Sequence, residues 1–227
     1  MKNITIAIDG PSGAGKSTSA SALAERLQLA HLDTGAMYRA LAAALLQDGL
    51  DPSDPDQVLA HLNHYDLSVD FEGDIQHTLV NGIDRSADLY TSQVSRAASD
   101  VSRYSQVRAY LVAIQRKLAE SQSFILDGRD IGTVVLPDAD IKFFLTASPE
   151  TRARRRWSEL QARGERLSLE EVLADIEARD YQDSHRADSP LKCADDAHVI
   201  DSSELSFDQV LDKMLTLIQA AGLELVP

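Results

Sequence analysis

Cysteine, basic charge and long apolar runs are all scarce in this chain of 227 residues. The single cysteine, Cys193, excludes an internal disulfide and a cysteine-rich metal site. Acidic residues outnumber basic residues by 36 to 22, a net charge of -14, which argues against a protein that follows a nucleic-acid backbone. No apolar run approaches the roughly 18 residues of a membrane span. We therefore expect a protein that binds neither nucleic acid nor membrane.

We expect no secretory leader at the start of the chain. Only Met1, Lys2 and Asn3 precede the apolar run at residues 4–8, and a charged leader region, an apolar signal core and a cleavage site do not fit into three residues. We expect a cytoplasmic protein. With 44% hydrophobic residues, the chain can bury one α/β core with small appendages.

A glycine-rich segment after the first apolar run carries a specific phosphate-binding pattern. It fits G-x-x-x-x-G-K-[ST] between an expected strand and an expected helix, with Gly10, Pro11, Ser12, Gly13, Ala14, Gly15, Lys16 and Ser17. The glycines allow backbone N–H groups to surround phosphate oxygens, and the N-terminus of the next helix favours the same anion. Lys16 would add charge on the outer phosphates, and Ser17 a hydroxyl for Mg²⁺. The pattern predicts binding of a nucleoside triphosphate.

Short apolar strands alternate with longer helical stretches, which is typical of a parallel sheet covered by helices. The expected strands are residues 4–8, 30–33, 123–127, 141–145 and 198–201. The expected helices are residues 17–27, 34–47, 92–102, 106–120, 151–164 and a stretch that begins near 168. The sequence thus predicts an α/β fold with a five-stranded parallel sheet.

Residues from about 54 to 103 do not follow this alternation of strands and helices. Leu67, Val69 and Phe71 alternate with polar residues, and Asn81 and Gly82 form a dipeptide that is favoured in tight hairpins. We expect a small antiparallel insert that is too short to be an independent domain. The chain is then a single domain with a core made of about 1–50, 104–150 and 190–227, and an arginine-rich segment lies at about 151–167.

Two further motifs follow expected strands at their carboxyl ends, where ligands bind in open α/β sheets. The first covers residues 33–39, from which Thr34, Tyr38 and Arg39 would face the phosphate site, although Thr34 is also a good helix N-cap. The second covers residues 127–133. An apolar strand that ends in an aspartate such as Asp127 is similar to the Walker B arrangement, in which the carboxylate holds Mg²⁺ directly or through water.

Arginines cluster in two later helices against the acidic background. Arg152, Arg155 and Arg156 share one side of the first helix, so they could close over a triphosphate or form a solvated face. A face of the next helix carries Arg179, Asp183 and Arg186. By itself this spacing is typical of an intrahelical ion-pair ladder.

Taken together, the motifs resemble those of bacterial cytidylate kinases over essentially the whole chain. The patterns D-[ST]-G-A-x-Y-R at residues 33–39 and D-G-R-D-x-G-T at residues 127–133 are specific to that family, and the phosphate-binding loop alone is not. The resemblance implies the P-loop NTPase fold and transfer of the γ-phosphoryl group of ATP to CMP or dCMP, with Mg²⁺ as cofactor. It also implies a monomer that takes part in pyrimidine nucleotide metabolism.

The resemblance further implies a role for each matching position. The acceptor phosphate would be held by Arg39, Arg129 and Arg186, with help from Thr34 and Tyr38. Cytosine would be read by Ser99, Arg108 and Asp130, and the sugar by Arg179 and Asp183. ATP would lie on the loop from Gly10 to Thr18, under a lid that includes Arg152 and Arg156 and excludes water. The implied catalytic residues are Lys16, Arg129, Arg152, Arg156 and Arg186, and the implied metal ligands are Ser17 and Asp127.

Two departures from the family pattern limit this assignment. Ser17 and Thr18 follow the loop lysine where some relatives have Gly-Thr, so either hydroxyl could reach the metal. The lid also holds an extra arginine, Arg154, to which the pattern gives no role.

Two other functions stay open at this point. A kinase for UMP or another monophosphate would carry much the same motifs. A nucleotide-switched regulatory protein of the GTPase type would need a guanine-reading N-K-x-D, which the sequence lacks. The six histidines show no metal-ligand spacing, and phosphoryl transfer needs positioning and charge more than a conspicuous base.

Overall fold

The computed structural model describes residues 3–223, and Asp88 by its backbone alone. Met1 and Lys2, on which the expected absence of a leader rests, lie outside the described residues. The same is true of residues 224–227 at the end of the expected core.

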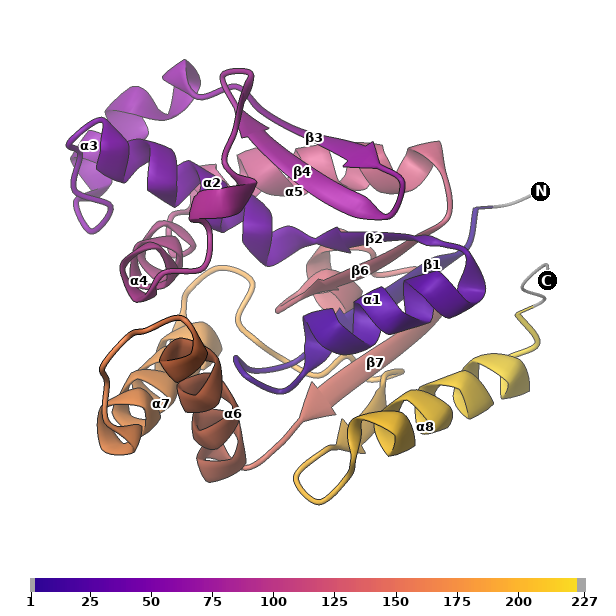
Figure 1. Cartoon of the computed structure of the whole chain (residues 1–227). Helices are drawn as coiled ribbons and strands as arrows, with labels where there is room; N and C mark the ends of the chain where they lie inside the picture. Colours follow the sequence, from indigo (N-terminus) through magenta and orange to yellow (C-terminus); the bar gives the residue numbers. More distant parts are fainter. Residues whose placement is uncertain (1–2, 224–227) are drawn as a thin grey trace.

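A five-stranded parallel sheet forms the centre of the molecule, in the order β2-β6-β1-β7-β8 (Figure 1). Its strands are β1 (Thr5–Asp9), β2 (Ala30–Asp33), β6 (Phe124–Gly128), β7 (Ile141–Thr146) and β8 (His198–Asp201). The predicted parallel sheet is confirmed, with each strand within one residue of its expected limits.

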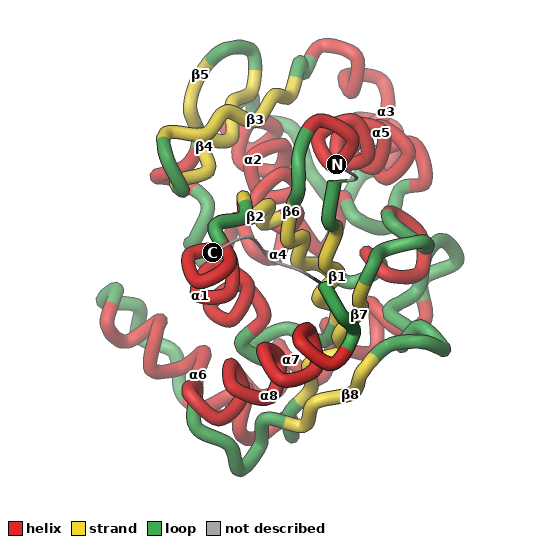
Figure 2. Tube along the Cα trace, turned by 90° about the vertical axis from the view of Figure 1, so that its right-hand side faces the viewer, coloured by secondary structure: helices red, strands yellow, loops and turns green. Residues whose placement is uncertain are grey.

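Helices cover both faces of this sheet. The helices of the described residues are α1 (Lys16–Leu27), α2 (Thr34–Gln47), α3 (Pro55–His61), α4 (Ser92–Val101), α5 (Ser105–Ser121), α6 (Pro149–Ala162), α7 (Leu169–His185) and α8 (Phe207–Ala220), with short turns η1 (Leu62–His64), η2 (Ser86–Asp88) and η3 (Ile131–Val135). Figures 1 and 2 show α1 beside α8 on one side of the sheet and α2 with α5 on the other. Within residues 3–223, no helix combines the length and the apolar character needed to cross a bilayer.

The alternation of side chains along β1 explains these layers. Ile6 and Ile8 are fully buried among residues of α1 and α8. Ala7, which points the other way, packs with the cluster of α2 and α5. Strands buried on both faces read as continuous apolar runs, and that is the pattern of residues 4–8.

The insert folds as an antiparallel sheet of β3 (Leu67–Glu72), β4 (Ile75–Val80) and β5 (Ile83–Asp84). Asn81 and Gly82 turn the chain from β4 into β5 with φ of 53° and 73°, as a type I′ hairpin requires. Leu67 and Val80 are buried in the same cluster as α2. The insert therefore shares the core of the parallel sheet and has none of its own.

Polar residues end three neighbouring strands at one edge of the parallel sheet. The register pairs Asp33 of β2 with Asp127 of β6, and Asp9 of β1 with Gly128 of β6. This edge receives the loops that the sequence singles out.

Candidate active site

The loop between β1 and α1 turns on three glycines with positive φ, which are Gly10 (146°), Gly13 (75°) and Gly15 (93°). A Cβ on Gly10 would lie 1.9 Å from the backbone oxygen of Leu145, and one on Gly13 would lie 3.1 Å from Cβ of Arg152. Gly15 is the N-cap of α1 and offers no side-chain acceptor to the first N–H groups of the helix. The loop thus leaves these donors available to an anion.

Lys16 begins α1 and lies almost wholly buried, with 6% of its surface exposed. Its Nζ donates to the backbone oxygen of Pro11 at 2.9 Å. Burial lowers the pKa of Lys16 to about 7, and the positive charges of Arg129 and Arg179 act in the same direction. A phosphate bound here would restore the charged form of the lysine.

Ser17 at the start of α1 contacts Asp127 of β6. Oγ of Ser17 donates to Oδ2 of Asp127 at 2.7 Å, and Nε2 of His31 lies 2.7 Å from Oδ1 of the same carboxylate. Burial alone would raise the pKa of Asp127, but the contacts with His31, Lys16 and Ser17 outweigh it and lower that pKa. An ionised carboxylate beside a hydroxyl supplies the oxygen ligands that Mg²⁺ prefers. The residues fit the ion, and the contact favours Ser17 over Thr18 as its hydroxyl ligand.

His31 is a functional candidate that the sequence analysis missed. It lies in β2, 96 positions before Asp127, so no local pattern links the two residues. Only the pairing of β2 with β6 brings them together.

The motif at residues 33–39 ties the end of β2 to its neighbours. Asp33, and not Thr34, caps α2, because its side chain accepts from the backbone N–H of Ala36. The alternative reading of Thr34 as N-cap is therefore wrong. Oγ1 of Thr34 donates instead to the backbone oxygen of Asp127 at 2.7 Å, and Nη2 of Arg39 lies 2.6 Å from Oδ2 of Asp33.

Asp183 lies at the centre of an arginine cluster. Nε of Arg129 donates to its Oδ2 at 2.9 Å, while Arg179 and Arg186 approach the carboxylate at 3.9 and 3.8 Å. Burial and the positive charge of Arg129 lower the pKa of Arg179 to about 10. The shortest contact of Asp183 thus runs to another element, so this face is more than an intrahelical ladder. Its three guanidinium groups surround one carboxylate, which leaves a net positive charge.

Arg108 and Asp130 form a buried pair, with exposed fractions of 4% and 5%. Nη2 of Arg108 hydrogen-bonds to Oδ2 of Asp130, and Nη2 of Arg186 lies 3.8 Å from Oδ1. Cζ of Arg108 lies 5.7 Å from the ring centre of Tyr38, whose pKa burial raises to about 12. A buried charge pair beside a cleft can present both a donor and an acceptor to a polar ligand.

The arginines of α6 point in different directions. Arg152 bridges the phosphate-binding loop and α7, since it donates to the backbone oxygen of Ser12 at 3.2 Å and lies 2.7 Å from Asp180. The guanidinium of Arg155 turns away to Ser202, where it donates to the backbone oxygen at 2.7 Å. The expectation that Arg155 closes over the triphosphate is therefore wrong, because its donors are taken up at the end of β8.

One cleft of about 590 Å³ brings the predicted residues together between α1, α2, α4, α6 and α7. The expected site residues that line it are Ser12, Gly13, Gly15, Lys16, Ser17, Thr18, Thr34, Tyr38, Arg39, Ser99, Arg108, Asp127, Arg129, Asp130, Arg156, Arg179, Asp183 and Arg186. The other expected residues, which are not among those that line it, are Gly10, Pro11, Ala14 and Arg152.

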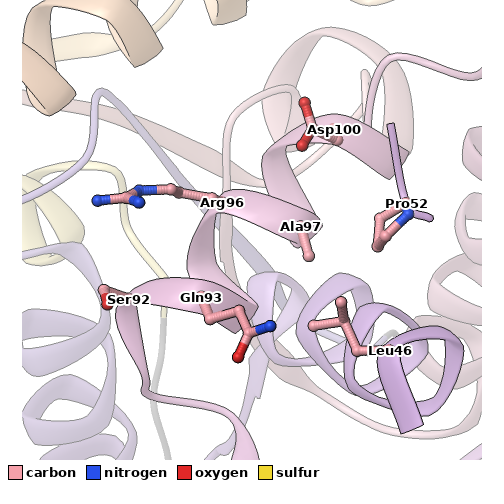
Figure 3. Close-up of a pocket in the computed structure, with 7 residues that line it drawn as sticks. All are labelled: Leu46, Pro52, Ser92, Gln93, Arg96, Ala97 and Asp100. Carbon is pink, nitrogen blue, oxygen red and sulfur yellow. The ribbon is translucent and has the colours of Figure 1, made fainter. Parts of the chain in front are cut away.

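A smaller hollow of about 240 Å³ lies beside α4, where Ala97 is near Leu46 of α2 and Pro52 (Figure 3). Its lining includes none of the expected site residues. This hollow therefore does not belong to the site that the sequence predicts.

Comparison with known proteins decides the family of the chain. The family described as Cytidylate kinase matches residues 6–220. The chain belongs to the cytidylate kinase family. Its relatives include the cytidylate kinases of Corynebacterium glutamicum (47% identical over 220 residues, 96% of each chain) and of Geobacter sulfurreducens (46% over 220 residues, 96% of this chain and 94% of that one). A cytidylate kinase is a nucleoside monophosphate kinase, so the chain is an enzyme of the class that its motifs predict.

Solved structures of low identity agree with the fold of this cytidylate kinase family member. An uncharacterized protein from Eubacterium ventriosum has a TM-score of 0.53 at 16% identity and covers 96% of this chain and 99% of its own. A gluconokinase from Sinorhizobium meliloti has a TM-score of 0.50 at 13% identity, with 98% of this chain and 96% of its own covered. These likenesses show a shared fold alone.

Proposed function

We propose that this member of the cytidylate kinase family transfers the γ-phosphoryl group of ATP to the phosphate of CMP or dCMP, giving ADP and CDP or dCDP. The observation that carries the proposal is the density of cations in one cleft of an acidic protein. Lys16, Arg129 and Arg179 lie close enough for burial and mutual repulsion to lower the pKa of Lys16 and of Arg179. Such a cluster is complemented by anions, and the transfer places two phosphate groups side by side.

The donor would bind at the phosphate-binding loop. The uncapped N–H groups of α1 and the ammonium of Lys16 would hold the outer phosphates of ATP. Ser17 and Asp127 would hold Mg²⁺, which neutralises charge on the phosphate oxygens when it is bound. Arg152 and Arg156 would add positive charge from the lid side, and Arg152 already contacts the loop at Ser12.

The acceptor phosphate would bind at the opposite part of the cleft. Arg39, Arg129 and Arg186 line the cleft, and their planar guanidinium groups suit bidentate contact with phosphate. Thr34 and Tyr38 line the same cleft and would assist them. Arg129 connects the donor and acceptor regions of the cleft, because its charge lowers the pKa of Lys16 while its Nε donates to Asp183.

The base would be selected by the buried pair of Arg108 and Asp130 together with Ser99. Cytosine presents an amino donor next to a ring acceptor, which matches the carboxylate oxygen of Asp130 and the N–H groups of Arg108. Uracil presents an oxygen where cytosine has its amino group, so its oxygen would face a buried carboxylate. Leaving such a group without a partner costs about 1–3 kcal/mol. The sugar would contact Arg179 and Asp183.

We also propose that residues of about 54–103 form the acceptor-binding insert and those of about 151–167 the lid. Two contacts support this division, because the two segments meet across the cleft: Arg163 donates to the backbone oxygen of Tyr90 at 3.0 Å, and the N–H of Ser92 donates to Glu165 at 3.2 Å. Closure of this kind would exclude water from the phosphoryl group. A monomeric state and a cytoplasmic location are parts of the same proposal.

A coupled assay of ADP release tests the proposal with ATP·Mg²⁺ and each of CMP, dCMP, UMP and AMP. We expect fast and selective release with CMP and dCMP. Equal rates with UMP would leave a monophosphate kinase without cytosine selection. Absence of any acceptor-dependent release would overturn the proposed function.

A further inference from the structure

Gln182 of α7 makes two hydrogen bonds to one residue of α4. Its Nε2 donates to the backbone oxygen of Ser99 and to Oγ of Ser99, both at 2.8 Å. The two residues are 83 positions apart and line the same cleft. Neither local sequence pattern nor the motifs of the family assignment singles out Gln182.

We propose that Gln182 is a positioning residue that fixes the hydroxyl group of Ser99 for recognition of the acceptor base. This inference rests on the proposed function, in which Ser99 contacts cytosine. The inference adds Gln182, which acts on the base through Ser99 and makes this contact only when α7 lies against α4.

The end of α4 explains why the side-chain amide of Gln182 makes both of its hydrogen bonds to Ser99. Ser99 lies in the last turn of α4 (Ser92–Val101), where backbone oxygens lack helical partners. Its oxygen accepts from Oγ of Ser102 at 2.8 Å and from Gln182. Because the first amide N–H is bound to this oxygen, the second is directed at the hydroxyl.

The contact changes what the Ser99 hydroxyl can do. A serine hydroxyl has one donor and two acceptor positions, and it rotates to suit its partners. Gln182 occupies one acceptor position and so restricts that rotation. A freely rotating hydroxyl can hydrogen-bond to the polar edge of cytosine or of uracil, whereas a fixed hydroxyl matches one arrangement of donors and acceptors better. A hydroxyl that is fixed in the arrangement suited to cytosine lowers the cost of binding CMP and not that of UMP, so it contributes to selectivity.

The same contact connects base recognition to the approach of α7. Gln182 is next to Asp183, which bonds to Arg129. Arg96 of α4 and Asp175 of α7 form a second link across the cleft, at 3.2 Å. The packing of α7 against α4 would therefore bring the sugar contacts and the oriented Ser99 hydroxyl into place together.

Kinetics of Gln182→Met with CMP and UMP test the inference. Methionine keeps the length of the side chain and removes both donors. Loss of the hydrogen bond that orients the Ser99 hydroxyl should lower kcat/KM for CMP by up to about tenfold, with a much smaller fall for UMP and an unchanged KM for ATP. Gln182→Glu, which has the same shape but cannot donate, should lose selectivity in the same way. Gln182→Lys, which keeps N–H donors, should retain more of it.

Two controls separate positioning from a general effect on the fold. Gln219→Met changes an exposed glutamine of α8 and should leave all rates unaltered. In a Ser99→Ala background, Gln182→Met should have no further effect on the ratio of CMP to UMP use, since the positioned group is gone. Thermal melting of each variant checks that the fold is intact.

The outcomes distinguish this inference from the proposed function. A wild-type enzyme that uses CMP and UMP equally well would overturn this inference together with the cytosine selection in the proposed function. If the wild type prefers CMP, two results would overturn the inference alone. One is that Gln182→Met and Gln182→Glu keep that preference, and the other is that Gln182→Met lowers the ratio of CMP to UMP use equally with and without Ser99→Ala.

Discussion

Nε of Arg129 donates a hydrogen bond to Oδ2 of Asp183 at 2.9 Å, and this bond joins the loop after β6 to helix α7. Asp183 is buried and its pKa is lowered, since burial is outweighed by the charges of Arg129, Arg179 and Arg186. The carboxylate therefore stays ionised and holds Arg129 in one orientation in the cleft. Phosphoryl transfer depends on charge that is already in place, so this orientation is central to the account.

Replacement of Arg129 by alanine should lower kcat/KM for CMP by about a hundredfold or more. The variant loses a group that acts on the acceptor phosphate, while the loop that binds ATP keeps its glycines and Lys16. Steady-state kinetics and equilibrium binding of ATP measure the two effects separately. Arg154→Ala, which removes an exposed arginine of α6, is the matched control and should leave both unchanged. A loss mainly in ATP binding would contradict the assignment of Arg129.

Replacement of Asp183 by alanine should raise the KM for CMP and dCMP by about tenfold or more and leave ATP affinity close to that of the wild type. The variant removes the sugar contact and also frees Arg129. For the second reason, its effect should be smaller in an Arg129→Ala background, which a double-mutant cycle measures. Unchanged kinetics with CMP and dCMP would show that Asp183 and the arginines of this helix face only form ion pairs with one another.

Replacement of Ser17 and of Thr18 by alanine should change the magnesium dependence of the reaction rate to different extents. Ser17 bonds to Asp127 at 2.7 Å, so Ser17→Ala removes a group next to the carboxylate that would hold the ion. We expect the Mg²⁺ concentration for half-maximal rate to rise by about tenfold. Thr18→Ala should change it little, and a titration of Mg²⁺ at fixed ATP compares them. A larger shift for Thr18→Ala would transfer the metal role to that residue.

Gly10 and Gly49 form a matched pair for stability. Both have positive φ, at 146° and 73°, but a Cβ on Gly10 would meet the backbone of Leu145 at 1.9 Å whereas one on Gly49 would meet nothing within 4 Å. Gly49→Ala should cost about 1–2 kcal/mol, as expected for backbone conformation alone. Gly10→Ala should cost about 3 kcal/mol or more in the free energy of unfolding, because β7 must also shift. Urea denaturation tests both, and equal losses would contradict the packing of this loop.

Asp9 should make an unusual contribution to the pH dependence of stability. Burial raises its pKa from 3.8 to about 6, although it accepts hydrogen bonds from the N–H groups of Ile131 and Gly132. Between these two values the folded state keeps a proton that the unfolded state releases. The contribution is thus full below about pH 4 and is lost as the pH rises through 6.

Asp9→Asn, which does not titrate, isolates this contribution. The free energy of unfolding of the wild type minus that of the variant should fall by up to about 3 kcal/mol from pH 4 to pH 7. Urea unfolding of both proteins across this range measures the difference. A difference that stays flat or rises with pH would show that burial does not control this carboxyl group.

Local sequence patterns predicted the features that neighbouring residues determine. Glycine spacing located the phosphate-binding loop, and apolar runs located the five strands, because period and turn chemistry act within a few residues. Helix α8 escaped prediction although its signals were present, since Ser206 and Gln209 form a capping box ahead of the buried Val210 and Leu211.

The contacts that complete the site could not be predicted in this way. His31 bonds to Asp127, Gln182 to Ser99, and Arg155 to Ser202, across separations of 96, 83 and 47 positions. Helical spacing indicated that Arg155 shares a face with Arg152, but the packing of α6 beside the end of β8 decided where its guanidinium lies. Pairings of this kind depend on the tertiary arrangement and leave no trace in local periodicity.

The fate of the γ-phosphoryl group is the most direct test of the central claim. ATP labelled in that group is incubated with Mg²⁺, CMP and the enzyme, and the products are separated by chromatography. The account predicts that the label appears in CDP, that it does so only when CMP is present, and that Arg129→Ala suppresses it. Label released as inorganic phosphate at the same rate with and without CMP would contradict the account and identify a hydrolase.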